Sequence, residues 1–218
     1  MQSENPPGRT PRRQFLAQVT AAAASALTLS PFSGFAQSIA SDKVPGDADA
    51  WMKPMKGKHK QIFHAVRAEI QPMLMAKNFL DSYEESYGAK PGHVNVAIGF
   101  HGGALAFGFN DALWNKYAMG KASDVTDPST KEPALRNIFA TGGDLAIDTL
   151  QKRGVVFLMC NTALRLRTKS MAASLNVPYD TLYTELSAGR LPGVILVPSL
   201  VVALNRAQEN GFTYIRAS

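Results

Sequence analysis

The chain has 218 residues, 45% of them hydrophobic, and its 23 basic and 17 acidic side chains give a formal net charge of +6. This basic excess is small, and no Lys/Arg run with interleaved aromatic residues occurs, so we expect no nucleic acid as a partner. The single cysteine, Cys160, cannot form an internal disulfide. It also excludes dithiol redox chemistry within the chain, because a resolving cysteine is missing.

The first 36 residues have the organisation of an export signal. Arg12 and Arg13 precede a mildly apolar stretch from Leu16 to Leu29, and small residues follow as far as Ala36. The order Arg-Arg-x-Phe-Leu resembles the twin-arginine signal, which is read by a receptor that exports folded proteins. The apolar stretch is too short and too mild for a membrane span. We therefore expect cleavage after Ala36, with Ala40 as the alternative point, and a periplasmic mature protein with no membrane contact. The alternative interpretation is a merely basic, amphipathic N-terminus.

Residues 37–58 predict a linker or arm, because they are polar and contain Pro45, Gly46 and Pro54. Trp51 and Met52 are the side chains expected to anchor this arm. Residues 59–218 are long enough for one compact domain with a sizeable core.

Within residues 59–218, short apolar runs alternate with helical patterns, which predicts a mostly parallel sheet with helices on both faces. Asp144 is the expected N-cap of the third helix. In the last helix, Val201, Leu204 and Ala207 are expected to face inward. Residues 116–136 are predicted to form a long loop. The expected strands are 61–66, 93–100, 155–159, 194–197 and 212–215. The expected helices are 73–87, a short one that runs through 114, 144–153, one after 160, one from 180, and 198–210.

Three junctions follow the predicted second, third and fourth strands. They are His101-Gly102-Gly103, Cys160-Asn161-Thr162 and Pro198-Ser199. Because the carboxyl ends of parallel strands meet at one edge of a sheet, these junctions are expected to lie together.

Cys160 stands at the expected N-terminus of a helix, where unpaired N–H groups and the helix dipole favour a thiolate. Arg165, Arg167 and Lys169 add positive charge nearby. Sulfur transfer through a persulfide needs one nucleophilic thiolate, which this chain supplies. The alternative is a small buried core residue, since free cysteine is among the most buried residue types.

Two segments, "VVFLMCNTAL" and "LPGVILVPSLVVALNRAQENGFTYI", resemble the DsrE/DsrF-like (YchN-like) family over roughly residues 60–218. The resemblance implies a three-layer α/β/α sandwich, assembly into trimers or hexamers, and Cys160 as the catalytic sulfur carrier. The proposed export and the 116–136 insertion depart from the family pattern, so the sulfur donor or acceptor protein stays open. The residues expected to bind substrate beside Cys160 are His101, Gly102, Asn161, Thr162 and Ser199.

Other chemistry has less support in the sequence. No Gly-x-Ser-x-Gly elbow or phosphate-binding loop occurs. The four histidines, His59, His64, His93 and His101, lack tight metal-ligand spacing, so neither a metal nor a cofactor is predicted. Two functions therefore remain: an exported sulfur carrier or sulfurtransferase-like protein, and a non-catalytic oligomeric module that binds a small ligand or a protein.

Overall fold

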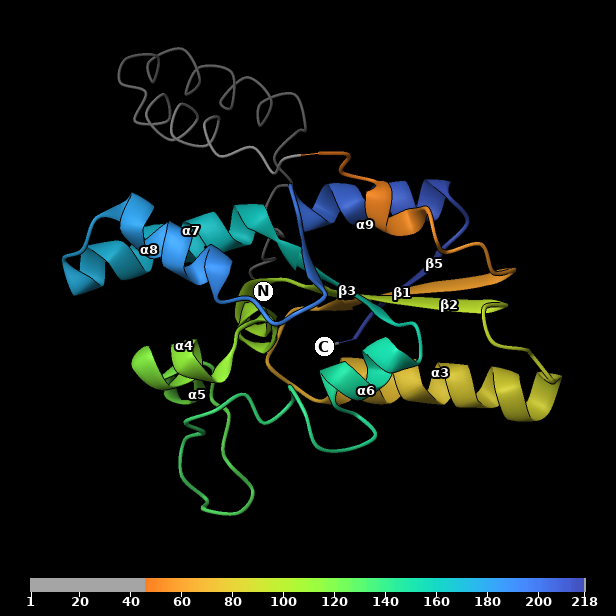
Figure 1. Ribbon diagram of the computed structural model, residues 1–218, viewed down its shortest axis with the longest axis horizontal. Helices are drawn as coiled ribbons and strands as arrows, with labels where there is room; N and C mark the ends of the chain where they lie inside the picture. Colours follow the sequence, from red (N-terminus) through yellow and green to blue (C-terminus); the bar gives the residue numbers. More distant parts are fainter. Residues whose placement is uncertain (1–45, 218) are drawn as a thin grey trace, which may run out of the picture. The chain divides into compact units, whose positions relative to one another are not determined.

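The computed structural model describes residues 46–217 and confirms an α/β domain. Its five strands form one sheet in the order β4-β3-β2-β1-β5, and every neighbouring pair is parallel (Figure 1). The strands are β1 (His59–Ala65), β2 (Val94–Phe100), β3 (Val156–Cys160), β4 (Val194–Val197) and β5 (Thr213–Arg216).

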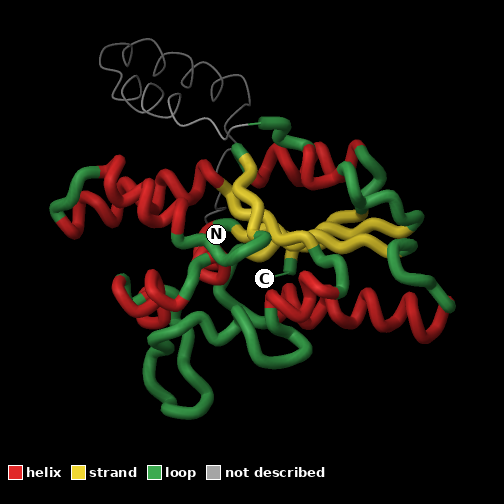
Figure 2. Tube along the Cα trace, in the orientation of Figure 1, coloured by secondary structure: helices red, strands yellow, loops and turns green. Residues whose placement is uncertain are grey.

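Helices cover both faces of the sheet, so the three-layer α/β/α arrangement is confirmed (Figures 1 and 2). The short 3-10 helix η1 (Ala50–Met52) and helix α9 (Leu200–Glu209) lie on one face, and α3 (Gln71–Tyr87) and α6 (Ile147–Lys152) lie on the other. Helix α9 and helix α3 lie on opposite faces because their crossovers run in opposite directions across the sheet. Helix α3 leads from β1 to β2, whereas α9 leads from β4 back to β5 at the other edge. Parallel crossovers are right-handed, so a reversal of direction places the helix on the other face.

Two further groups of helices lie beyond the carboxyl ends of the strands. Helices α7 (Asn161–Leu175) and α8 (Tyr179–Ala188) pack against each other after β3. The 3-10 helix η2 (Gly102–Gly108) and the short helices α4 (Asp111–Lys116) and α5 (Met119–Ala122) follow β2. No helix within residues 46–217 combines the length and apolar character that a membrane span requires.

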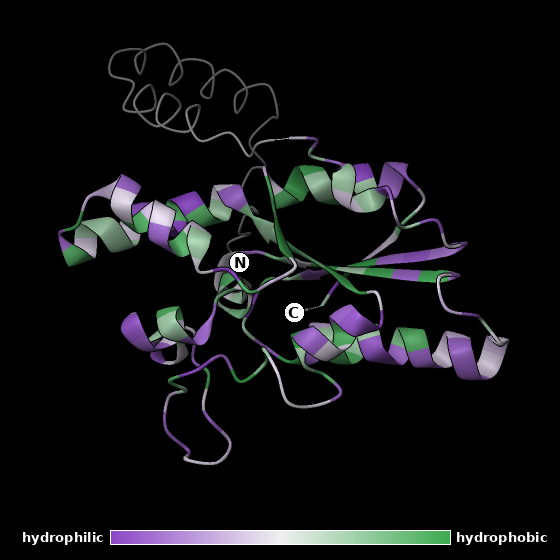
Figure 3. Ribbon diagram, in the orientation of Figure 1, coloured by the Kyte–Doolittle hydropathy of each residue, from purple (hydrophilic) through white to green (hydrophobic). Residues whose placement is uncertain are grey.

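The core packs around the three inner strands, β1, β2 and β3. Much of the ribbon of β3 is coloured as hydrophobic in Figure 3. Gly99 in β2 makes room for Leu200, the first residue of α9, whose side-chain carbons occupy the place where a Cβ on Gly99 would lie. Leu200 is completely buried. The absence of a side chain at Gly99 therefore lets the N-terminus of α9 approach the sheet closely.

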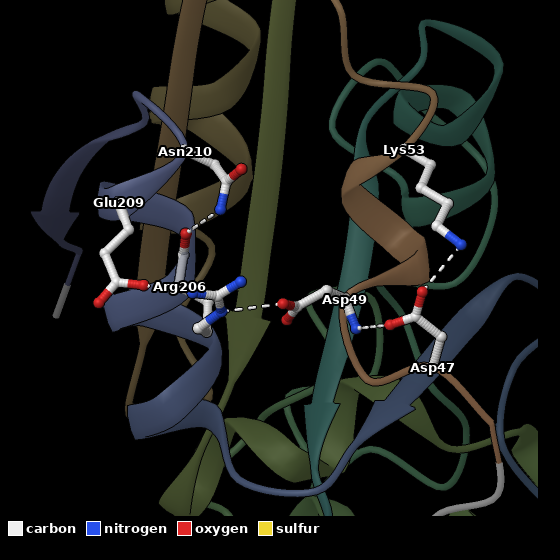
Figure 4. A network of polar contacts seen from close by, with 6 residues as sticks. All are labelled: Asp47, Asp49, Lys53, Arg206, Glu209 and Asn210. Carbon is white, nitrogen blue, oxygen red and sulfur yellow. Dashed lines mark hydrogen bonds and ion pairs between the residues drawn. The ribbon is translucent and has the colours of Figure 1, made fainter.

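The described part of the predicted arm packs on the domain. Trp51 and Met52 are buried, as expected, and the Trp51 ring lies 5.7 Å from that of Phe212. A surface network supports the same contact, with Arg206 Nε 2.8 Å from Asp49 Oδ2 (Figure 4). Residues 37–45 and the proposed signal at 1–36 lie outside the described residues.

Two predicted helix details are wrong. Helix α6 begins at Ile147 rather than after Asp144, because Phe139 and Ala140 accept hydrogen bonds from the N–H groups of Ile147 and Asp148. Val201 is 64% exposed instead of facing inward. The inner face of α9 is instead formed by Leu200, Ala203, Leu204 and Ala207, because the burial of Leu200 beside Gly99 fixes the rotation of the helix.

The 116–136 segment is not loop throughout. It contains α5, and Thr126 and Pro133 pair in an isolated antiparallel bridge. Met119 and Gly120 are buried, and Gly120 lies so close to the backbone of Ala134 that a side chain at position 120 would clash with it. The predicted loop therefore folds back on itself and carries a small apolar contact of its own.

Candidate functional site

The three predicted junctions lie at the same edge of the sheet. His101 follows β2, Cys160 ends β3 and Pro198 follows β4, and these three strands are neighbours in the sheet. Because all the strands are parallel, their carboxyl ends share one edge. The sequence prediction that these junctions meet is therefore confirmed.

The Cys160 sulfur accepts hydrogen bonds from two helices. The N–H of Ala163, in the first turn of α7, lies 3.4 Å from Sγ, and the N–H of Leu200, the first residue of α9, lies 3.3 Å from it. Cys160 is thus the N-cap of α7 and also receives a donor from a second helix terminus. Both donors favour negative charge on the sulfur, as do the positive ends of the two helix dipoles.

The same two helix termini are joined by a second contact. The backbone N–H and the hydroxyl of Thr162 both donate to the carbonyl oxygen of Pro198, at 3.2 and 3.1 Å. Ser199 occupies the N-cap position of α9, but its side chain makes no capping hydrogen bond. Thr162 therefore fixes the relative position of the two termini, whereas the partly exposed Ser199 hydroxyl is not used as a cap.

Asn161 is buried in the α7–α8 pair. Its amide oxygen accepts a hydrogen bond of 2.8 Å from the hydroxyl of Tyr183 in α8. Arg190, just after α8, interacts electrostatically with Tyr183, and burial lowers the pKa of its guanidinium. The Arg190 Nε is itself buried without a hydrogen-bond partner. Asn161 thus holds α8 against α7, behind the cysteine.

His101 and Gly102 lie on the other side of Cys160. Gly102 has a positive φ of 55° and lies close to the Val66 carbonyl, so the chain turns sharply after His101. The Nδ1 of His101 lies 3.3 Å from the Nε2 of His64, in β1. On the far side of His64, Nδ1 lies 3.1 Å from the hydroxyl of Tyr214, in β5.

No role for His64 or Tyr214 follows from the sequence alone. Alternation within β1 gives the face on which His64 points, but not which strand lies beside it. The last strand pairs with the first, so Tyr214 comes next to His64 although the two are 150 positions apart. The only local signal was the position of His64 near the end of a predicted strand.

The described residues do not offer a complete metal site. Within residues 46–217, no three or more His, Cys, Asp or Glu side chains are grouped to hold a metal ion. The His64–His101 pair provides two imidazoles, with a tyrosine hydroxyl on the outer side. The His64–His101–Tyr214 arrangement is suited to proton exchange. The nearby Cys160 is buried, with 2% of the residue exposed.

Comparison with known proteins adds little to this description. No protein-family model matches the chain, and no curated protein matches it. A solved structure of a protein of unknown function from Methanobacterium thermoautotrophicum matches with a TM-score of 0.40 and 16% sequence identity, covering 73% of this chain and 99% of that chain. A likeness at this level carries no information on function.

Proposed function

We propose that this protein is an exported sulfur carrier that holds a persulfide on Cys160. The observation that supports the proposal is the position of Sγ between two helix N-termini, with N–H donors at 3.4 and 3.3 Å. Such donors favour a thiolate, the form of cysteine that acts as a nucleophile. They also suit the negative charge of a persulfide anion.

The proposed transfer needs no external oxidant. The Cys160 thiolate attacks the outer sulfur of a donor persulfide, R–S–SH, and a new Sγ–S bond forms as the S–S bond of the donor breaks. The donor leaves as a thiolate, which takes up the proton that Cys160 released. The sulfane sulfur passes on at an unchanged oxidation level, so one cysteine suffices.

The second candidate is a non-catalytic binding module on the same fold. The observation that favours it is the burial of Cys160, which is 2% exposed. Under this alternative the sulfur serves only to cap α7 and tie α9 to it. The carrier requires that the N-terminal turn of α9 moves enough to admit a donor, whereas the binding module does not.

Mass spectrometry of the intact protein distinguishes the two candidates. After incubation with glutathione persulfide, the carrier is expected to gain the mass of one sulfur atom and to lose it when a reductant is added. Cys160→Ser should show no gain, and it is a matched control because serine can still cap the helix. A wild-type protein that gains no sulfur, and whose thiol reacts with iodoacetamide only after denaturation, would support the binding module.

Two further parts of the proposal rest on the sequence. We infer a periplasmic location from Arg12-Arg13 and the apolar stretch after them. We also infer self-association into a trimer or hexamer, which the family resemblance implies. A periplasmic carrier would exchange sulfur with a donor or acceptor protein of the same compartment.

A further inference from the structure

Three ionisable side chains form a continuous chain at the carboxyl edge of the sheet. The Tyr214 hydroxyl lies 3.1 Å from His64 Nδ1, and His64 Nε2 lies 3.3 Å from His101 Nδ1. The two imidazole rings are stacked, with their centroids 5.4 Å apart and their planes inclined by 27°. The chain runs from β5 through β1 to the end of β2, so it crosses three neighbouring strands.

The contacts allow two arrangements of protons. In one, Tyr214 donates to His64 and His64 donates to His101 Nδ1. The outer nitrogen of His101, Nε2, is then a donor. In the other, His101 donates to His64 and His64 donates to Tyr214, which leaves the outer nitrogen of His101 as an acceptor. A change from the first arrangement to the second passes one proton along the chain without moving a heavy atom: Tyr214, which is exposed, takes a proton from solvent as it gives its own to His64, and His101 releases one from its outer nitrogen.

The surroundings favour the neutral form of His64. Its pKa is lowered first by burial, then by His101 and by Arg216 of β5. Tyr214 faces it with its hydroxyl group, and residues 200–205 of α9 include no ionisable side chain. Arg67 and Glu69, in the loop after β1, form an ion pair of 3.6 Å with each other. Two imidazolium cations would repel each other across 3.3 Å, so the geometry disfavours a positive charge on both rings at once.

The strand pairing brings His101 to the level of Cys160. Phe100 in β2 and Met159 in β3 are partners, and His101 and Cys160 are the residues that follow them. His101 has an extended backbone, with φ −138° and ψ 157°, so β2 keeps its direction there. Side chains at the same level of adjacent strands point to the same face. This is the face of α9, whose Leu200 donates to the sulfur.

We propose that Tyr214, His64 and His101 form a proton relay for Cys160, in which His101 exchanges the proton and the other two residues set its tautomer. The proposal rests on the sulfur-carrier function. Before transfer, the outer nitrogen of His101 takes the proton of the Cys160 thiol, directly or through one water. After the donor S–S bond breaks, His101 gives that proton to the leaving thiolate, so no net proton is gained or lost.

The rate of sulfur loading from glutathione persulfide, measured between pH 5 and 8, tests the relay. In the wild type, loading should slow as the pH falls, because a protonated His101 cannot accept the thiol proton. His101→Gln should lower the rate about 100-fold, the scale of general acid–base catalysis, and should change the pH profile, because only the ionisation of the Cys160 thiol then limits loading. His64→Gln and Tyr214→Phe should have smaller effects, in that order, because they act through His101. His93→Gln is the matched control, since His93 is exposed at the opposite end of β2 and should load like the wild type.

A second measurement does not depend on any variant. Nuclear magnetic resonance titration of the wild-type imidazoles should show His64 and His101 taking up one proton between them before the second, at a lower pH. Independent titration of both rings would overturn the relay, as would loading by His101→Gln at the wild-type rate while wild-type Cys160 carries sulfur. If wild-type Cys160 takes up no sulfur at all, the carrier function itself fails, and the relay's role in it fails too.

Discussion

At the scale of single residues, the Cys160 sulfur has a structural role whatever its chemistry. It accepts two backbone N–H groups that have no other acceptor among the described contacts, one from Ala163 and one from Leu200. A sulfur acceptor is weak, but a buried donor left without any partner is costly. This is why a thiol can be kept at the junction of two helices even where it is 2% exposed.

Cys160→Ala is expected to lower the free energy of unfolding by about 1–3 kcal/mol, because both N–H groups lose their acceptor. Cys160→Ser should lose less, since its hydroxyl oxygen can accept at least one of them. Equilibrium urea denaturation of the two variants and the wild type would measure the difference. Equal stabilities for alanine and serine would show that the contacts to the sulfur contribute nothing.

At the scale of elements, the apolar patterns predicted most of the fold. β4 runs from Val194 to Val197 as expected, and α3 ends before Gly88 as its stripe indicated. The apolar patterns gave wrong or incomplete predictions where a contact between distant parts of the chain determines the structure. Leu200 sets the rotation of α9 only because Gly99 lies opposite it, and a sequence does not reveal that contact. Likewise, His64 and Tyr214 meet only because β5 pairs with β1.

The arm before β1 provides an element-scale prediction. Trp51→Ala removes a buried ring that packs on Phe212, and it should lower the free energy of unfolding by about 3–5 kcal/mol. Trp51→Phe should lose much less, because it keeps a ring and removes a buried Nε1 donor that has no partner. Urea denaturation would measure both variants.

Arg206→Ala is the comparison for the polar part of the same contact. Arg206 lies on the surface, where it pairs with Asp49 and Glu209, so its loss should change the free energy of unfolding by less than about 1 kcal/mol. A larger effect for Arg206→Ala than for Trp51→Ala would mean that the ion pairs, rather than the buried ring, hold the arm.

At the scale of the whole molecule, the first turn of α9 presents adjacent apolar side chains at the surface. Val201 is 64% exposed and Val202 is 57% exposed, although the inner face of the same helix is fully packed. They lie next to Ser199 and the edge of the sheet that carries Cys160. Apolar side chains in this position are suited to an interface between copies of the chain, which would also cover the candidate site.

We therefore expect light scattering to give a trimer or hexamer for the mature protein, and the double variant Val201→Asp/Val202→Asp to dissociate it. The helix itself should tolerate the change, because carboxylates are favourable in the first turn of a helix. Asn205→Asp is the matched control, since it adds a negative charge at an exposed position of the same helix and should leave the assembly intact. A wild-type protein that stays monomeric at every concentration would contradict the assembly, whereas an oligomer that survives the double variant would place its interface elsewhere.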